Sequence, residues 1–321
     1  MADHSNIEWT DATWNPITGC SVLSPGCTRC YAMKLAGTRL RNHPSRAGLT
    51  RESKTGPVWN GQVRFNEQWL TQPLEWKRPR KIFVCAHGDL FHENVPDEWI
   101  DRVFAVMASA PQHEYQVLTK RAHRMRRYVD DALGRVISTQ DRDKDWPGWP
   151  LPNVWLGVSA ERQKEADERI PELLATPAAQ RFISAEPLLG PLELALSWIS
   201  YGYATTPDRP LDWVIVGGES GQDARPMHPS WARLLRDQCA EYRVPFFFKQ
   251  WGSWKPSSPE EAIGNPYSGW LAHQGGVDRL VRREELYPDA GAAFVERVGK
   301  GSAGRLLDGL EHNGMPDRSA A

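Results

Sequence analysis

The chain of 321 residues lacks the features that mark several large classes of protein. No stretch approaches the roughly 18 consecutive apolar residues that a membrane-spanning helix needs. Met1–Thr10 has neither the basic start nor the apolar run of a secretory signal peptide. The formal net charge is only −1, whereas proteins that coat nucleic-acid duplexes are usually strongly basic. We therefore expect a cytoplasmic protein without a membrane partner, in which any nucleic-acid contact is confined to a local basic groove.

Cysteine is also scarce, but its distribution is uneven. There are five cysteines in all, and three of them, Cys20, Cys27 and Cys30, lie within eleven residues. Clustered thiols in a cytoplasmic protein indicate metal binding or redox chemistry, because structural disulfides rarely persist in that compartment. Of the two single cysteines, we expect Cys85 at the end of a strand and Cys239 on an outer helix.

The predicted strands are short apolar runs, each of which ends in a polar residue and precedes a helical or loop segment. They are rich in Val, Ile and Phe and barely alternate, which is typical of strands buried on both faces of a parallel sheet. Six runs follow this pattern: Lys81–Cys85, Glu114–Leu118, Asn153–Val158, Arg181–Ser184, Asp212–Val216 and Pro245–Phe248. A further strand is expected within Asn6–Trp14, before the clustered cysteines.

The spacing of these runs favours one fold class, an α/β protein built as a (β/α) barrel. The polar residues at the strand ends are 27 to 39 residues apart, and a complete barrel of about 250 residues has roughly 31 residues per unit. Amphipathic segments such as Asp97–Ala110 and Ser230–Tyr242 supply the helices. We predict a partial barrel of six or seven parallel strands over residues 1–277, with an eighth strand left open, and a helical or irregular C-terminal extension over residues 278–321.

Polar residues at the strand ends are candidates for a site, because the carboxyl ends of the strands form the active face of such barrels. The candidates are Asp89, Lys120, Ser159, Glu161, Glu186, Glu219 and Lys249. For any one of them, solvent exposure or capping of the following helix is an equally good explanation. A charged residue at nearly every strand end is harder to explain by stability, so we interpret the set as functional.

The clustered cysteines have the spacing C-x6-C-x2-C. Three thiolates so close in sequence can wrap one metal centre, and Gly19, Pro25 and Gly26 provide the turns that a wrapping loop needs. A fully ligated iron–sulfur cluster usually takes four protein ligands, so three would leave one iron open to a substrate or cofactor. The alternative is a structural zinc site with a histidine such as His43 as fourth ligand, although such sites usually come as paired two-ligand knuckles.

A three-cysteine loop directly after the first strand of a (β/α) barrel resembles the radical S-adenosylmethionine (SAM) superfamily. The chain resembles more closely the phage and bacterial three-Cys-motif family, which has no assigned reaction. Segments that carry this resemblance span nearly the whole chain: Gly19–Ala32, Leu118–Arg121, Val216–Gly221, Phe247–Gly252 and Arg305–Gly309. The commonest radical SAM pattern has three residues between the first two cysteines and an aromatic residue before the third. Here six residues separate Cys20 from Cys27, and Arg29 precedes Cys30.

The resemblance implies a radical SAM enzyme that uses a 4Fe–4S cluster to cleave SAM and start radical chemistry. Cys20, Cys27 and Cys30 would hold the cluster. The other candidates would act around it: Asp89, Ser159, Glu161 and Glu219 in binding the cofactor, and Cys85, Lys120 and Glu186 in catalysis. A reductant such as flavodoxin or ferredoxin would be a partner, and a phage-encoded protein would act in the host cytoplasm.

A basic tract at the predicted active face points to the substrate class. Lys120–Arg127 follows a strand end, and a basic patch beside aromatic residues suits a nucleic-acid strand or nucleotide. The candidate contacts are Arg121, Arg124, Arg126, Arg127 and Lys249. We therefore predict DNA or RNA as a partner and a nucleic-acid modification or repair lyase as the reaction class. Two alternatives stay open: the tract is a solvated helix face, or the chain is a zinc- or cluster-stabilised binding module without catalysis.

Overall fold

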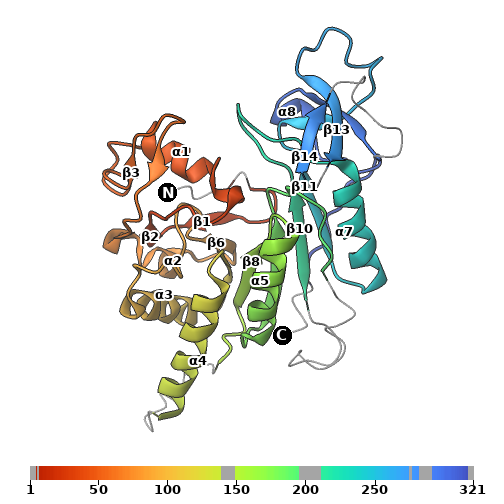
Figure 1. Ribbon diagram of the computed structural model, residues 1–321. Coiled ribbons are helices and arrows are strands. Elements are labelled where there is room, and N and C mark those ends of the chain that lie inside the picture. Colours follow the sequence, from red (N-terminus) through yellow and green to blue (C-terminus); the bar gives the residue numbers. More distant parts are fainter. Residues whose placement is uncertain are drawn as a thin grey trace.

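The structure, a computed structural model, describes residues 5, 7–138, 149–194, 211–274, 277–281 and 291–316. Its largest element is a seven-stranded sheet in the order β1-β6-β7-β8-β9-β10-β11, in which all neighbouring strands are parallel. The strands are β1 (Ala12–Trp14), β6 (Lys81–Val84), β7 (Glu114–Thr119), β8 (Val154–Ser159), β9 (Gln180–Ala185), β10 (Trp213–Gly217) and β11 (Phe246–Gln250). The sheet curls into a half-barrel (Figure 1), which confirms the predicted partial (β/α) barrel.

The longer helices pack on the outer face of the sheet. They are α3 (Asp97–Ser109), α4 (Ala122–Ser138), α5 (Gln163–Ala175) and α7 (Pro229–Glu241). In α3 the buried residues Ile100, Val103 and Met107 recur at the three- and four-residue spacing of one helix face. Its first turn carries Asp97, which suits the positive end of the helix dipole. No helix in the described part of the chain is both long enough and apolar enough to span a membrane.

Small elements between β1 and β6 form the side of the half-barrel that bears the clustered cysteines (Figure 1). They are β2 (Ile17–Thr18), η1 (Pro25–Cys27), α1 (Tyr31–Gly37), β3 (Thr50–Arg51), β4 (Val58–Trp59), β5 (Arg64–Phe65), η2 (Glu67–Trp69) and α2 (Gln72–Glu75). The cysteine loop leaves β2 at Gly19, which has a φ of +96°. A Cβ there would lie 2.2 Å from the carbonyl oxygen of Gln62, so only glycine fits.

A second, antiparallel sheet follows β11, with the strand order β12-β15-β13-β14. Its elements, with the short helix after them, are β12 (Trp254–Pro256), β13 (Ser268–Gln274), β14 (Val277–Val281), β15 (Ala293–Arg297) and α8 (Lys300–Ala303). The boundary predicted after residue 277 falls at the start of β14, and a division into two domains there stays a prediction. The chain then returns to β11, where the Phe248 N–H donates to His312 (3.0 Å) and the Gly314 N–H donates to Phe246 (2.9 Å).

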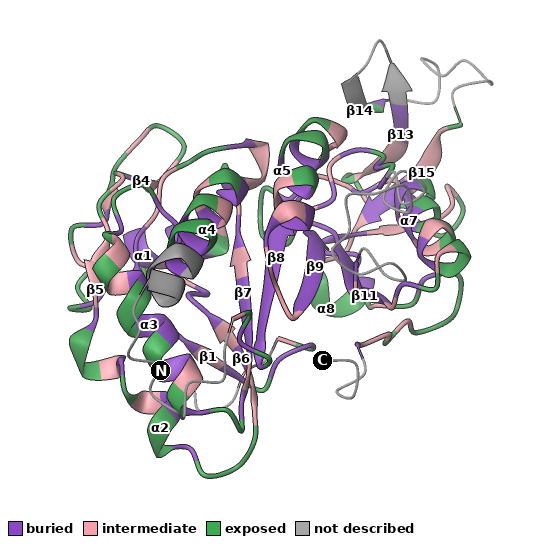
Figure 2. Cartoon of the chain, turned by 90° about the horizontal axis from the view of Figure 1, so that it is seen from below, coloured by how far each residue is buried: buried purple, intermediate pink, exposed green. Residues whose placement is uncertain are grey.

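Alternate residues along the parallel strands form two separate apolar clusters, because successive side chains point to opposite faces of a sheet. One cluster lies under the outer helices. The other fills the concave face with Trp9, Trp155, Phe182, Trp213, Ile215 and Phe247. The ring of Trp213 is central, with its centroid 5.9 to 6.1 Å from four neighbouring rings. The strands β8 and β9 are consequently buried on both faces along their whole length (Figure 2).

The same alternation positions the candidate site. Phe83 and Cys85 are two positions apart, Trp155 and Ser159 four, and Trp213 and Glu219 six. Cys85, Lys120, Ser159, Glu161, Glu186, Glu219 and Lys249 therefore continue the concave face beyond the aromatic layer, which we call the aromatic floor.

Candidate functional site

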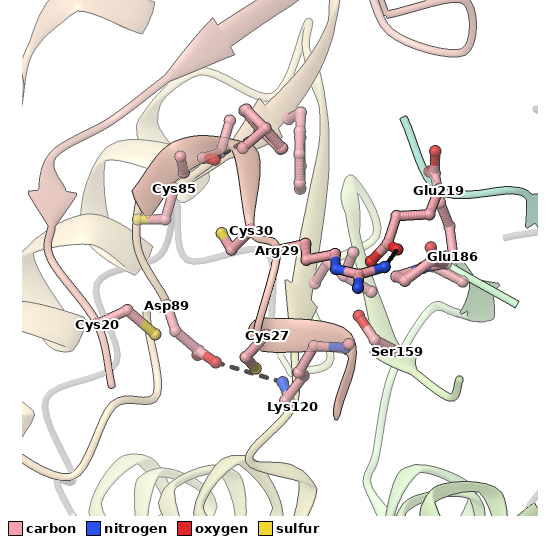
Figure 3. Close-up of a pocket in the computed structure, with 18 of the residues that line it drawn as sticks. Cys20, Cys27, Arg29, Cys30, Cys85, Asp89, Lys120, Ser159, Glu186 and Glu219 are labelled. Carbon is pink, nitrogen blue, oxygen red and sulfur yellow. Dashed lines mark hydrogen bonds and ion pairs between the residues drawn. The ribbon is translucent and has the colours of Figure 1, made fainter. Parts of the chain in front are cut away.

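A pocket of about 510 Å³ lies above the aromatic floor, where the parallel strands end (Figure 3). Its lining includes the clustered cysteines and most of the predicted site residues: Cys20, Cys27, Cys30, Cys85, Asp89, Lys120, Arg121, Ser159, Glu186, Glu219 and Lys249. Trp9 of the aromatic floor and Phe83, which packs against it, form apolar parts of the pocket wall. Parallel strands bring these residues together although they are far apart in sequence, as expected for the carboxyl-end face of such a sheet.

The thiols of Cys20, Cys27 and Cys30 border one part of this pocket, beside Asp89 and Lys120 (Figure 3). Burial raises the pKa of the Cys20 thiol to about 12, and the nearby Asp89 adds to the effect. Burial also raises the pKa of Cys30. Both thiols are therefore protonated at neutral pH, and a metal ion bound there would have to displace these protons.

The donor set of the three thiols is compatible with a 4Fe–4S cluster. Among the residues that the structure describes, no three His, Cys, Asp or Glu side chains converge closely enough to hold a single metal ion. Cluster ligands need a wider spacing, because each thiolate binds a different iron. His43, the fourth ligand considered for zinc, is not among the residues that line the pocket, and its Nδ1 lies 2.7 Å from the hydroxyl of Ser45.

Glu161 holds the cysteine loop from the β8 side. Its fully buried carboxylate accepts hydrogen bonds from the hydroxyl of Ser24 and from the backbone N–H of Gly26 (3.0 Å). Lys120 (3.1 Å) and Arg169 (3.0 Å) form ion pairs with the same carboxylate. Burial alone would raise the pKa of Glu161, but these partners outweigh burial and lower the pKa to about 2. The predicted cofactor-binding residue is therefore ionised and occupied by partners from the protein.

Glu219 holds the same loop from the β10 side. It pairs with Arg225 (2.6 Å) and with Arg29 (3.2 Å; Figure 3). Arg225 also donates a hydrogen bond to the carbonyl oxygen of Pro25 (3.0 Å). Burial alone would raise the pKa of Glu219, but the two arginines lower it. The Gly-Gly-Glu segment at the end of β10 thus connects directly to the loop between the second and third cysteines.

Asp89 is engaged by four donors of the protein. Its carboxylate accepts from the hydroxyl of Thr119 (2.7 Å) and from the backbone N–H groups of Phe91 (3.0 Å) and Lys120 (3.2 Å). It also pairs with Arg121 at 3.0 Å. These contacts fix the turn after β7 and the position of the Arg121 side chain. The cofactor-binding role predicted for Asp89 stays a prediction.

The groups open to a ligand lie across the pocket from Cys20 (Figure 3). The hydroxyls of Ser159 and Ser184, which are paired residues of β8 and β9, have no hydrogen-bond partner in the described part of the chain. Beside them Glu186 accepts from Lys249 (2.9 Å) and Gln250 (3.0 Å). A ligand with hydroxyl, amino or carboxylate groups finds both free and charged partners on this wall.

Cys85 directly follows β6, one residue beyond the end of the strand, and adds a further thiol to the pocket. Its backbone has a φ of +56°, in the left-handed region. Burial raises the pKa of its thiol to about 12, so this thiol is neutral. Its catalytic role stays a prediction.

Nearly the whole chain matches one known protein family. Residues 4–316 match the model of DUF5131, described as a protein of unknown function. The chain belongs to the DUF5131 family. No curated protein matches it. Two structures of spore photoproduct lyase are similar in part: one complexed with a dinucleoside spore photoproduct (12% identity) and one of a point mutant (11% identity), each with a TM-score of 0.31 over 84% of this chain and 67% of that chain.

The predicted nucleic-acid contacts of the DUF5131 protein separate into different environments. On α4, Arg124 pairs with Asp97, and Arg126 pairs with Asp130 and Glu172. Lys249 pairs with Glu186 in the pocket that the three cysteines line. Arg121 is buried, and its guanidinium pairs with Asp89 and Glu93. Arg127 is exposed and has no ion pair with any described residue. It lines a second pocket, of about 560 Å³, together with Lys120 and Arg121, which belong to both pockets.

Sequence reasoning missed the partners that hold the cysteine loop of the DUF5131 protein, namely Ser24, Arg169 and Arg225. Arg169 lies on α5 and is 4% exposed. An arginine on the inward side of an amphipathic helix was the one available signal, because a buried guanidinium needs an acidic partner. That signal does not identify the partner, which is eight residues earlier in the sequence.

Proposed function

We propose that this DUF5131 protein is a radical SAM enzyme, in which Cys20, Cys27 and Cys30 hold a 4Fe–4S cluster. One observation carries the proposal: three thiols of one loop line a single pocket at the carboxyl ends of a curled parallel sheet. When bound there, the cluster supplies the electron that cleaves a C–S bond of SAM. Three protein thiolates leave one iron for the cofactor.

The other residues would orient the loop and the cofactor. Glu161 and Glu219 fix the loop from two sides through buried charged hydrogen bonds. Ser159 and Ser184 offer free hydroxyls to the polar groups of SAM, and Glu186, a carboxylate of the same pocket, would bind its amine. The aromatic floor keeps water from the base of the pocket, which protects reactive species from side reactions.

The proposal is tested by anaerobic reconstitution with iron and sulfide in the wild-type protein and two cysteine variants. Cys27→Ala should lose most of the iron and sulfide and all SAM cleavage after reduction. Cys239→Ala is the matched control, because this cysteine is buried in α7 and does not line the pocket. It should load iron like the wild type. Stoichiometric iron in Cys27→Ala, or a colourless wild-type protein with one zinc, would contradict the proposal.

For the substrate we propose a nucleic-acid strand that enters past the second pocket. Among the lining residues of this pocket are seven lysines and arginines against three glutamates. Arg127 has no ion pair with any residue that the structure describes, so it would be the one to contact a phosphate. A reductant such as flavodoxin or ferredoxin would supply the electron to the cluster. The protein would act in the cytoplasm.

Arg127→Ala should weaken binding to single-stranded DNA and reduce the slope of log K against log salt by about one contact's worth, roughly 0.7. Arg126→Ala is the control, because Arg126 is already paired with Asp130 and Glu172. Fluorescence anisotropy at several salt concentrations measures both. Equal slopes for the wild type and Arg127→Ala would show that this tract is only a solvated helix face.

A further inference from the structure

The guanidinium of Arg121 lies against the first of the three clustered cysteines. Its Nη1 is 3.6 Å from the Sγ of Cys20, within the range of a hydrogen bond to sulfur. The same side chain donates from Nη2 to the hydroxyl of Ser21 at 2.6 Å. Arg121 therefore contacts two consecutive residues of the cysteine loop, although it is about a hundred residues away in sequence.

Arg121 is held in this orientation from its other side. Its Nε donates to both oxygens of Glu93 at 2.9 Å, and its Nη1 pairs with Asp89 at 3.0 Å. Asp89 is in turn fixed by Thr119 and by backbone N–H groups. The side chain of Arg121 is 3% exposed. A buried guanidinium with this many fixed partners has no freedom to turn away from the sulfur.

The ion pairs with Asp89 and Glu93 are enough to stabilise the buried guanidinium of Arg121. They do not explain why the guanidinium also contacts a cysteine sulfur. Hydrogen bonds and positive charge at cluster sulfurs stabilise the reduced form, which carries one more electron. Partners that orient the ligands of a metal centre commonly tune its properties in this way. No other arginine or lysine forms a hydrogen bond to a cysteine sulfur within the described residues.

We propose that Arg121 is a positioning residue that raises the reduction potential of the cluster through its hydrogen bond to the Cys20 sulfur. This inference rests on the proposed function, because it needs the cluster. Asp89 and Glu93 act through Arg121, which they aim at the sulfur. Within the described residues, Cys20 thus differs from Cys27 and Cys30 in having a cationic donor at its sulfur.

The test is an anaerobic redox titration of the reconstituted protein, followed by absorbance and by electron paramagnetic resonance. Arg121→Gln should shift the one-electron reduction equilibrium about tenfold toward the oxidised cluster, which is about 59 mV to lower potential. Arg121→Lys keeps the charge but loses the planar fork, so its shift should be smaller. Arg126→Gln removes the same charge at a half-exposed position on α4, and its potential should equal that of the wild type.

Iron and sulfide content, measured on each variant, separates the outcomes. A wild-type protein that binds no iron contradicts the proposed function and this inference with it. A loaded Arg121→Gln protein with the wild-type potential overturns this inference alone and leaves the proposed function standing. If Arg121→Gln fails to fold, Arg121→Lys decides, because a wild-type potential in that variant would show that the geometry at the sulfur does not matter.

Discussion

At Glu161 a carboxylate with no exposed surface meets two cations, a hydroxyl and a backbone N–H. A buried charge is tolerated only when partners of this kind replace its hydration. The partners come from three separate parts of the chain: the cysteine loop, the turn between β7 and α4, and the middle of α5. The ion pairs and hydrogen bonds of Glu161 thus connect the cysteine loop to two other parts of the barrel.

The pH dependence of the free energy of unfolding should show how much these contacts of Glu161 stabilise the fold. The folded pKa of Glu161, about 2, is below its unfolded value, so the ionised group stabilises the fold above pH 4 to 5. That stabilisation, on the order of 3 kcal/mol, is lost as the pH falls toward 2. Glu161→Gln should therefore be less stable than the wild type at pH 7, and the gap should narrow by about 1 to 2 kcal/mol at pH 3.

Urea unfolding at pH 7, 5, 4 and 3, followed by circular dichroism, measures the gap for each protein. Lys164→Gln serves as the control, because Lys164 is exposed and only weakly paired with Glu168 at 3.9 Å. A gap between Glu161→Gln and the wild type that is constant from pH 7 to pH 3 would mean that the Glu161 carboxylate is not held as described.

At the scale of the elements, the parallel strands could be predicted because each is a continuous apolar run. All six predicted runs overlap strands of the sheet, and the seventh strand lies within Asn6–Trp14. The antiparallel sheet after β11 was not predicted. β12 pairs with β15 across some forty residues, so no local pattern marks the pairing. Strands stabilised by distant partners leave a weak signal in sequence.

Helix boundaries show the same limit. The helix predicted from Ser230 begins at Pro229, and its N-cap is His228, whose ring accepts a hydrogen bond from the backbone N–H of Ser230. Proline in the first turn was the better signal, because its missing N–H costs nothing there. The predicted and observed starts of this helix differ by one residue.

For the site, the sequence locates the strand ends but not the contacts between them. Successive candidates such as Ser159 and Glu186 meet because parallel strands end at one edge. Whether a carboxylate faces a ligand or an arginine depends on side-chain directions set by the whole fold. Asp89, Glu161 and Glu219 are each saturated by protein donors, which sequence alone cannot show. Ser184 was overlooked because serine is uninformative without its neighbour Ser159.

For the molecule as a whole, a half-barrel leaves two free strand edges, and an open edge invites pairing with another chain. At β11 the C-terminal segment occupies this edge. The backbones of His312 and Gly314 pair with Phe248 and Phe246. The carbonyl oxygen of Gly314 also accepts a hydrogen bond from the indole of Trp213 at 2.7 Å. The tail therefore closes the edge and satisfies the central ring of the aromatic floor at once.

A chain that ends at Leu310 should lose both functions of the tail. Without Gly314 the buried indole N–H of Trp213 lacks its acceptor, which should cost about 1 to 3 kcal/mol. The uncovered edge of β11 should also pair with other copies, so the truncated protein should unfold at lower temperature and form dimers or larger species. A chain that ends at Pro316 keeps the paired residues and should behave like the full-length protein. Differential scanning calorimetry and light scattering measure the two effects. If the chain ending at Leu310 keeps the oligomeric state and the unfolding temperature of the 321-residue chain, the tail is not what protects this edge.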